Sequence, residues 1–340
     1  MSDVSVNSLE RGMIVNSDIF SKRGSLLLYK GFKIENPDLV SIVLHRNGIK
    51  SVSIKDSDEE IETPPVKETE RISKQVIEEV EEFKAEFSKA VEGLVESVEE
   101  FTEDKDIKHL TKLDKAQSIA KENEKSVLTI FQLVEKAKTE DRDKYSDTVQ
   151  VSLLSYAIGK WLDLSEEQLK ELSEAAMLSG VFAIAGINED NKDELKGTKT
   201  ISKDVLESAL ASRERFDGSG PMGLKSDHIP KYSRVIAIAD VFYALTTTSE
   251  LHEKLSVFDA LKVMQSDYVT LLDPEVLYVF LHRVANKYIG STVRLSDGTS
   301  GVIVFVPENQ VMLPFIRTTD GQIMNLQSDM YRNNKIIEIL

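Results

Sequence analysis

The chain has 340 residues, a formal net charge of −16 and no cysteine. Its length predicts two or three domains. The lack of cysteine excludes disulfides, thiolate zinc sites and cysteine nucleophiles, and the acidic balance argues against nucleic-acid binding, which needs a basic surface. No apolar run reaches the roughly 18 residues of a membrane-spanning helix, and the N-terminus has no signal-peptide pattern. We therefore expect a cytoplasmic protein without a membrane span.

Residues 1–55 predict a small N-terminal α+β module. The stretches MIVNSDIF and GSLLLYKG alternate like short strands on either side of Gly24. The following stretch, NPDLVSIVLHRNGIKSVSI, predicts a short helix, a stop at Gly48 and a final strand.

Most of the negative charge lies between residues 56 and 106. This segment holds 19 Asp or Glu against 6 Lys or Arg, a net −13 that leaves −3 for the rest of the chain. Residues 56–70 include Pro64 and Pro65 and predict an acidic linker. Most of the negative net charge therefore belongs to this one segment, and the rest of the chain is nearly neutral.

Residues 71–106 predict an amphipathic helix with a narrow apolar stripe. The stripe recurs at steps of three and four residues: Val76, Val80, Phe83, Phe87, Ala90, Leu94, Val98 and Phe101. This spacing suits a coiled coil, which would make the protein a homodimer, and it suits a helix packed on its own domain equally well. Both alternatives stay open at this point.

Residues 112–287 predict an all-helical domain, and residues 288–340 predict a small β-hairpin module. Ser165 and Gln168 have the spacing of a capping box at a helix start. In the last module, Asp-Gly pairs separate alternating apolar runs, as is typical of hairpins. The predicted fold class is therefore mainly α, with two small flanking modules. The predicted helices are 115–138, 146–164, 165–187, 231–248, 256–267 and 273–288.

The stretch ERFDGSGPMGLKSDHIPKYSRVIAIADVFYALTTT resembles the signature of the HD-GYP family. KYSDTVQVSLLSYAIGKWLDLSEEQLKELSEAAML resembles an earlier family segment, and LERGMIVNSDIFSKRGSLLLYKG is similar to a module often found ahead of HD-GYP domains. The resemblance covers most of the chain. It implies the fold of the HD phosphohydrolases and cyclic di-GMP phosphodiesterase chemistry, with two or three iron or manganese ions held by imidazoles and carboxylates.

The chain departs from the family pattern at the expected metal ligands. Asp147 stands at the first histidine, Ser179 and Gly180 stand at the HD pair, and Ser212 and Arg213 stand at a histidine pair. The Asp of DALT becomes Tyr243, and the Tyr-Pro of GYP becomes Pro221 and Met222. None of the five histidines, His45, His109, His228, His252 and His282, falls at a ligand position.

These departures lead us to expect a degenerate member of the family: a pseudoenzyme without catalytic residues, a bound metal or another cofactor. It would act in cyclic di-GMP signalling as a nucleotide sensor or as a protein-interaction regulator, with a diguanylate cyclase or another signalling protein as partner. The residues expected to contact the ligand or partner lie in and around one loop: Arg213, Arg215, Asp217, Gly218, Gly220, Lys225 and Arg234.

Two other functions remain open. An active phosphodiesterase would need an atypical, carboxylate-rich site for iron or manganese, for which the candidates are Asp147, Glu214, Asp217 and Asp240. A structural scaffold would use the helix at residues 71–106 for dimerisation.

Overall fold

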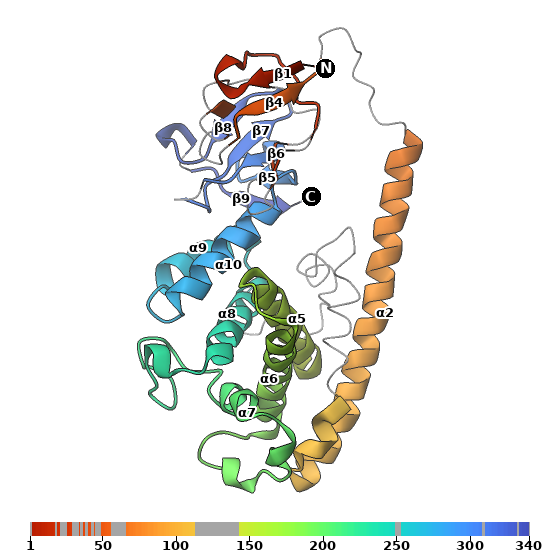
Figure 1. Cartoon of the computed structure of the whole chain (residues 1–340), viewed down its shortest axis with the longest axis vertical. Coiled ribbons are helices and arrows are strands. Elements are labelled where there is room, and N and C mark those ends of the chain that lie inside the picture. The colour runs from red at the N-terminus through yellow and green to blue at the C-terminus, as the bar shows by residue number, and fades with distance from the viewer. Residues whose placement is uncertain are drawn as a thin grey trace. The chain divides into compact units, whose positions relative to one another are not determined.

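The chain folds into two compact units, residues 66–281 and residues 1–65 with 282–340 (Figure 1). The predicted helix at 115–138 lies outside the described residues. The computed structural model describes residues 2–17, 19–20, 26–28, 34, 37, 40–41, 44, 49–55, 66–112, 143–248, 253–307, 310–331 and 333–339.

The fold is mainly helical, as predicted. Among the described residues, no helix is long and apolar enough to cross a membrane. The helices are α2 (Val66–Asp104), α5 (Lys144–Trp161), α6 (Glu166–Ala185), α7 (Lys203–Leu210), α8 (Lys231–Thr246), α9 (Val257–Asp267) and α10 (Pro274–Lys287).

Local sequence signals fix the ends of these helices. The capping box predicted at the start of α6 is present, because the Ser165 side chain accepts from the Gln168 amide and the Gln168 side chain accepts from the Ser165 amide. Gly186 ends α6 in the left-handed conformation, with φ of 70°. Asp143 caps α5 by accepting from the amides of Tyr145 and Ser146.

Helices α5 and α6 pack closely because Gly159 has no side chain. A Cβ at this position would lie 2.7 Å from Leu172 and 2.8 Å from Leu169. Nearby, Phe242 meets Phe280 edge to face, with ring centroids 5.2 Å apart. These contacts build the core that holds α5, α6 and α8 in place.

Helix α2 begins at Val66 rather than at Arg71, directly after the Pro64-Pro65 pair. Its apolar stripe is buried within a single chain from Phe83 to Phe101. Phe101 stacks on Phe182 of α6 with ring centroids 6.2 Å apart. This burial supports the alternative in which the helix packs on its own domain; the coiled coil and the homodimer stay predictions.

The C-terminal end of α2 is joined to the segment after α6 by backbone pairing. Lys105, with φ of 61°, ends the helix, and its carbonyl accepts from the amide of Lys196 at 2.9 Å. The amide of Ile107 donates to the carbonyl of Lys196 at 3.0 Å. This connection anchors α2 to the loop that leads to α7.

His109 adds a pH-dependent contact at the same helix end. Its Nδ1 lies 3.1 Å from Glu100 Oε2 and its Nε2 lies 3.2 Å from Asp104 Oδ2. The hydrogen bond to Asp104 is the main reason that the pKa of His109 lies above its usual value of 6.5. The stabilisation is therefore complete below the unfolded-state pKa, and it is lost as pH rises through the higher folded-state pKa.

We expect His109→Gln to lower the urea midpoint of unfolding more at about pH 5.5 than at about pH 8.5. The measurement is a set of urea titrations of both proteins across that range, with His228→Gln as the control for an exposed histidine. An equal loss of stability at both pH values would contradict the expectation.

The second unit combines the two small modules. In the first module, strand β1 (Ser2–Ser5) pairs antiparallel with β4 (Ser51–Ile54), and β2 (Ile19–Phe20) pairs with β3 (Leu26–Leu28). Val304 of the C-terminal module packs against the N-terminal hydrophobic core. The two modules therefore fold together as one unit, which their separation in the sequence does not reveal.

The C-terminal module is a five-stranded antiparallel sheet in the order β8-β7-β6-β5-β9. The predicted Asp-Gly turns are present, with Gly298 at φ of 87° and Gly321 at φ of 86°. This confirms the hairpin prediction. The strands are β5 (Thr292–Leu295), β6 (Ser300–Phe305), β7 (Phe315–Thr318), β8 (Ile323–Asn325) and β9 (Ile336–Ile339).

Candidate functional site

A pocket of about 280 Å³ lies between α5, α6, α8 and the turn after α7. We call it the Asp147 pocket. It joins an apolar wall to polar side chains, which is typical of ligand sites. Its lining residues are Lys144, Asp147, Thr148, Val151, Ala176, Ser179, Gly180, Ala183, Ile184, Ser212, Arg213, Ile236 and Asp240.

The pocket brings together five of the positions at which the chain departs from the family motif. Asp147 comes from α5, Ser179 and Gly180 come from α6, and Ser212 and Arg213 follow α7. These residues are far apart in the sequence, and the fold collects them around one cavity. The place that the resemblance gives to the family's metal site is therefore a pocket in this protein.

Opposite charges line the pocket. Tyr243 donates its hydroxyl hydrogen to Asp147 Oδ1 at 2.6 Å and so links α8 to α5. Lys144 and Arg213 are exposed at the pocket, and within the described part of the chain neither side chain has an ion-pair or hydrogen-bond partner. Among the described residues, the site therefore holds two cations without a partner next to a fixed carboxylate.

Gly180 gives space to a neighbouring side chain. A Cβ at Gly180 would overlap Thr148 Oγ1 and Cγ2. Thr148 in turn donates to the carbonyl of Lys144 at 2.8 Å. The room that an aspartate would need at the second HD position is thus filled by the α5 threonine.

Glu214 organises the loop that follows α7. Its side chain is buried, and its two oxygens accept from the amides of Met222 and Leu224, both at 2.7 Å. Gly220 is required by this arrangement, since a Cβ there would lie 2.6 Å from Glu214 Cα and 2.8 Å from the Arg215 nitrogen. Glu214 therefore holds the loop together.

Asp217 also serves the loop. Its Oδ1 accepts from the amide of Ser219 at 2.9 Å. Hydrogen bonds from the side chain and then the backbone of Ser219 lower the pKa of Asp217. The next residue, Gly218, has φ of 85°, and the stem of Lys225 lies against it.

The candidate loop cations do not act as a group. Arg215 donates to the carbonyls of Arg213 and Glu214, and Arg234 forms an ion pair with the buried Asp273 at 2.9 Å. Only Arg213 among the predicted loop residues lines the Asp147 pocket. The predicted contact set is therefore divided between loop architecture and the pocket.

The four predicted carboxylates do not form one metal site. Asp147 and Asp240 line the pocket, whereas Glu214 and Asp217 bind backbone amides of the loop. In the described ranges, no group of three or more His, Asp or Glu is placed to hold a metal ion. These donors do not fit a cluster of two or three ions, so we derive no chemical step through a metal.

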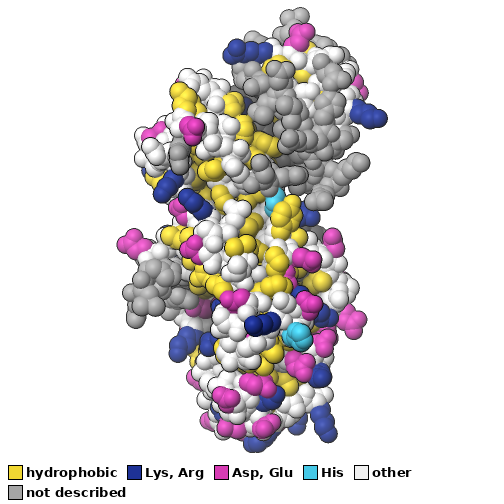
Figure 2. Space-filling view, turned by 90° about the vertical axis from the view of Figure 1, so that its left-hand side faces the viewer, with side chains coloured by type: hydrophobic (Ala, Val, Ile, Leu, Met, Phe, Trp, Pro, Cys, Tyr) yellow, Lys and Arg dark blue, Asp and Glu magenta, His cyan; other side chains and the backbone are white. Residues whose placement is uncertain are grey.

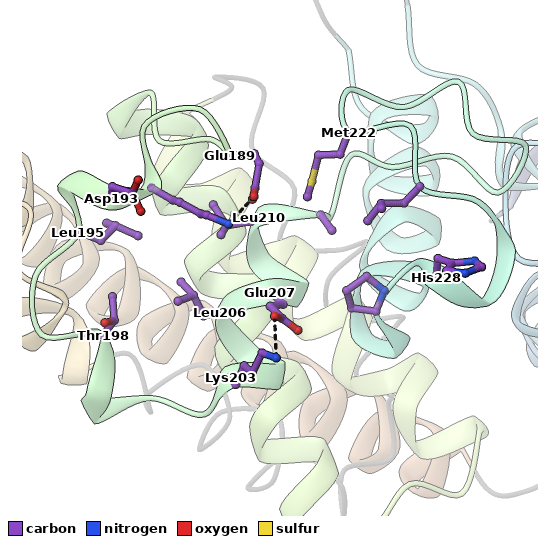
Figure 3. Close-up of a pocket in the computed structure, with 14 residues that line it drawn as sticks. Glu189, Asp193, Leu195, Thr198, Lys203, Leu206, Glu207, Leu210, Met222 and His228 are labelled. Carbon is purple, nitrogen blue, oxygen red and sulfur yellow. Dashed lines mark hydrogen bonds and ion pairs between the residues drawn. The ribbon is translucent and has the colours of Figure 1, made fainter.

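A larger cavity of about 580 Å³ lies along α7, between the loops before and after it (Figure 3). Its charged residues largely satisfy one another, because Lys192 pairs with Glu189 and Lys203 pairs with Glu207 (Figure 3). His228 also lines it, and its Nδ1 lies 3.2 Å from the Lys225 carbonyl. Charged groups that are already paired make this cavity a weaker anion site than the Asp147 pocket.

The surface of the helical unit carries charges of both signs on the face shown in Figure 2. In the space-filling view, acidic and basic side chains are interspersed over the helical unit (Figure 2).

Several pocket residues could not be found from the sequence. Lys144, Thr148 and Ser212 have no chemical signature of their own, and only the fold places them beside Asp147. Tyr243 was visible as a departure from the motif, but its contact with Asp147 joins residues 96 positions apart. The sequence signals this contact only in that Asp147 and Tyr243 both stand at positions where the chain departs from the family motif.

Comparisons with known proteins find an HD domain and phosphodiesterase relatives. The HD domain family model matches residues 188–276. A cyclic di-GMP phosphodiesterase of Pseudomonas aeruginosa is 25% identical over 202 residues, covering 53% of this chain and 49% of the relative. The cyclic di-GMP phosphodiesterase response regulator RpfG of Xanthomonas campestris is 28% identical over 155 residues, covering 39% and 41%. The chain thus spans half or less of the length of these relatives.

A solved HDG"Y"P protein from Bdellovibrio bacteriovorus has the same fold. It aligns with a TM-score of 0.50 and 14% identity, over 83% of this chain and 99% of that one.

The comparisons correct one expectation. The sequence departures predicted that the chain is not an enzyme, but several curated relatives are named cyclic di-GMP phosphodiesterases and point to an enzyme family. Motif departures alone do not decide activity, because they say nothing about the groups that the fold brings in from elsewhere. The matched HD domain and the similarity to these relatives support an HD-GYP-type protein, and the solved neighbour shows the shared fold.

Proposed function

We propose that the helical unit binds a cyclic dinucleotide, with cyclic di-GMP as the first ligand to test, and acts in cyclic di-GMP signalling. One observation carries this proposal: residues from three separate motif segments converge on the Asp147 pocket. The names of the relatives support the ligand class.

The charges of the pocket suit a phosphodiester. Lys144 and Arg213 are exposed at its edge, and a guanidinium binds phosphate oxygens through two parallel hydrogen bonds. Hydroxyl groups of Thr148, Ser179 and Ser212 lie in the same lining. The ligand's phosphate is therefore expected at the exposed cations.

Hydrolysis of the bound ligand is the second candidate function, favoured by the phosphodiesterase relatives. Both functions use the same pocket, so both are measured on the same samples. A diguanylate cyclase or other protein partner, a homodimer and a cytoplasmic location stay predictions.

The test is titration calorimetry of the full chain with cyclic di-GMP. We expect Arg213→Ala to weaken binding about 10- to 100-fold, because a hydrogen-bonded cation is lost from the phosphate. Lys170→Ala is the matched control, since Lys170 is an exposed lysine on α6 outside the pocket lining.

Chromatography of the same mixtures, with and without manganese or iron, separates intact ligand from its linear product. Binding that is absent at high micromolar cyclic di-GMP, or that Arg213→Ala leaves unchanged, would contradict the proposal. Turnover that requires added metal would favour the second candidate function.

A further inference from the structure

The Asp147 carboxylate is held in place by a buried tyrosine. The Tyr243 hydroxyl donates to Asp147 Oδ1 at 2.6 Å, and Tyr243 is only 3% exposed. A carboxylate only accepts hydrogen bonds and offers about four lone-pair positions on two oxygens. The pocket therefore contains an oriented acceptor group whose position is fixed by packing of a second helix.

Part of the pocket wall is apolar. Val151, Ala176 and Ile236 are buried, and Ile184 is half-buried. At about 280 Å³, the cavity lies below the range of about 300–1,000 Å³ that is typical for whole small-molecule ligands. One planar base fits such a space better than an entire cyclic dinucleotide does.

The arrangement separates a base position from a phosphate position. The apolar residues Val151, Ala176 and Ile236 are buried and Asp147 is half-buried, while Lys144 and Arg213 are exposed. A nucleotide has the same division, with a flat, weakly solvated base at one end and an anion at the other. The pocket is therefore matched to one nucleotide half of the ligand.

The hydrogen-bonding chemistry then decides which base enters. The Watson–Crick edge of guanine presents two adjacent donors, N1–H and the 2-amino group, which match two carboxylate oxygens. The same edge of adenine presents a donor beside the N1 acceptor, and the lone pair of N1 repels a carboxylate. A site built to receive a ligand's donors strongly rejects an analogue that lacks them.

We infer that the Asp147 carboxylate, positioned by Tyr243, selects a guanine base in this pocket. The inference rests on the proposed function, because it concerns the same pocket and the same ligand class. It assigns base selectivity to Asp147 and a positioning role to Tyr243, which acts through Asp147.

The test compares three ligands on the full chain by titration calorimetry: cyclic di-GMP, cyclic di-AMP and the inosine analogue of cyclic di-GMP, which lacks the 2-amino groups. We expect wild-type protein to bind cyclic di-GMP at least about 100-fold more tightly than cyclic di-AMP. The inosine analogue should fall between the two, because it retains N1–H.

Two variants assign the selectivity to named residues. Asp147→Asn should reduce the preference for cyclic di-GMP over the inosine analogue to near one, since one acceptor is lost. Tyr243→Phe keeps the buried ring and removes only the hydroxyl, so it should reduce the same preference by about 10-fold. Thermal unfolding of both variants checks that the fold is retained. A purely structural role would lower affinity for all three ligands equally.

Glu167→Gln is the matched control, because it removes a carboxylate charge from an exposed position of α6 outside the pocket lining. It should leave the preference among the three ligands unchanged. Equal binding of cyclic di-GMP and cyclic di-AMP would overturn the inference and leave the proposed function standing. Full selectivity in Asp147→Asn, or its loss in Glu167→Gln, would also overturn the inference. A wild-type protein that binds none of the ligands would instead overturn the proposed function itself.

Discussion

Glu214→Ala is expected to lower the free energy of unfolding by about 2–5 kcal/mol, because two backbone amides lose their acceptor at once. The carboxylate is 3% exposed and accepts from Met222 and Leu224 at 2.7 Å each. Water replaces such an acceptor poorly in a buried position. The loop should therefore open locally, and chemical denaturation together with hydrogen exchange at the two amides measures both effects.

Two further variants test this assignment. Asp227→Ala removes an exposed carboxylate from the same loop and should change stability by less than about 0.5 kcal/mol. Gly220→Ala should resemble Glu214→Ala, since its Cβ would meet the Glu214 backbone at 2.6 Å. A Glu214→Ala protein of normal stability that has lost stoichiometric manganese would contradict the structural role and restore Glu214 as a metal ligand.

The same residue shows what the sequence could and could not predict about the site. Glu214 belongs to a long motif, so its importance was visible in the sequence. Its role was not, because a carboxylate that binds a metal and one that binds backbone amides occupy the same place in a motif. Only the two amides at hydrogen-bond distance distinguish them.

The fold was more predictable because its signals are local. The capping box of Ser165 and the Asp-Gly turns depend on residues a few positions apart, and both are present. The joining of the two small modules was not predictable, since Val304 packs against a core that lies 250 or more residues away in the sequence. The pairing of Tyr243 with Asp147 was missed for the same reason.

The apolar stripe of α2 was ambiguous because one pattern serves two kinds of packing. Spacing of three and four residues reports which face is apolar, and it does not report whether the face meets a second copy or the same chain. From Phe83 to Phe101 the apolar face of α2 is buried, so in this part of the helix the face is covered within one chain.

Phe101→Ala is expected to lower the free energy of unfolding by about 3–5 kcal/mol, because it opens a cavity between α2 and α6. Phe101 is 0% exposed and stacks on Phe182 at 6.2 Å. Phe101→Leu should lose less, since it fills part of the cavity, and Glu103→Ala on the exposed face is the control.

The dependence of unfolding on protein concentration shows whether Phe101 stabilises α2 by packing within one chain or by packing in a dimer interface. Packing within one chain gives the same loss at every protein concentration, whereas packing in a dimer interface gives a loss that grows as the wild-type dimer is populated. Thermal unfolding of wild type and Phe101→Ala over a range of protein concentrations, alongside sedimentation, measures the difference. A loss below about 1 kcal/mol, or one that appears only at high concentration, would mean that α2 draws its stability from a partner helix rather than from α6.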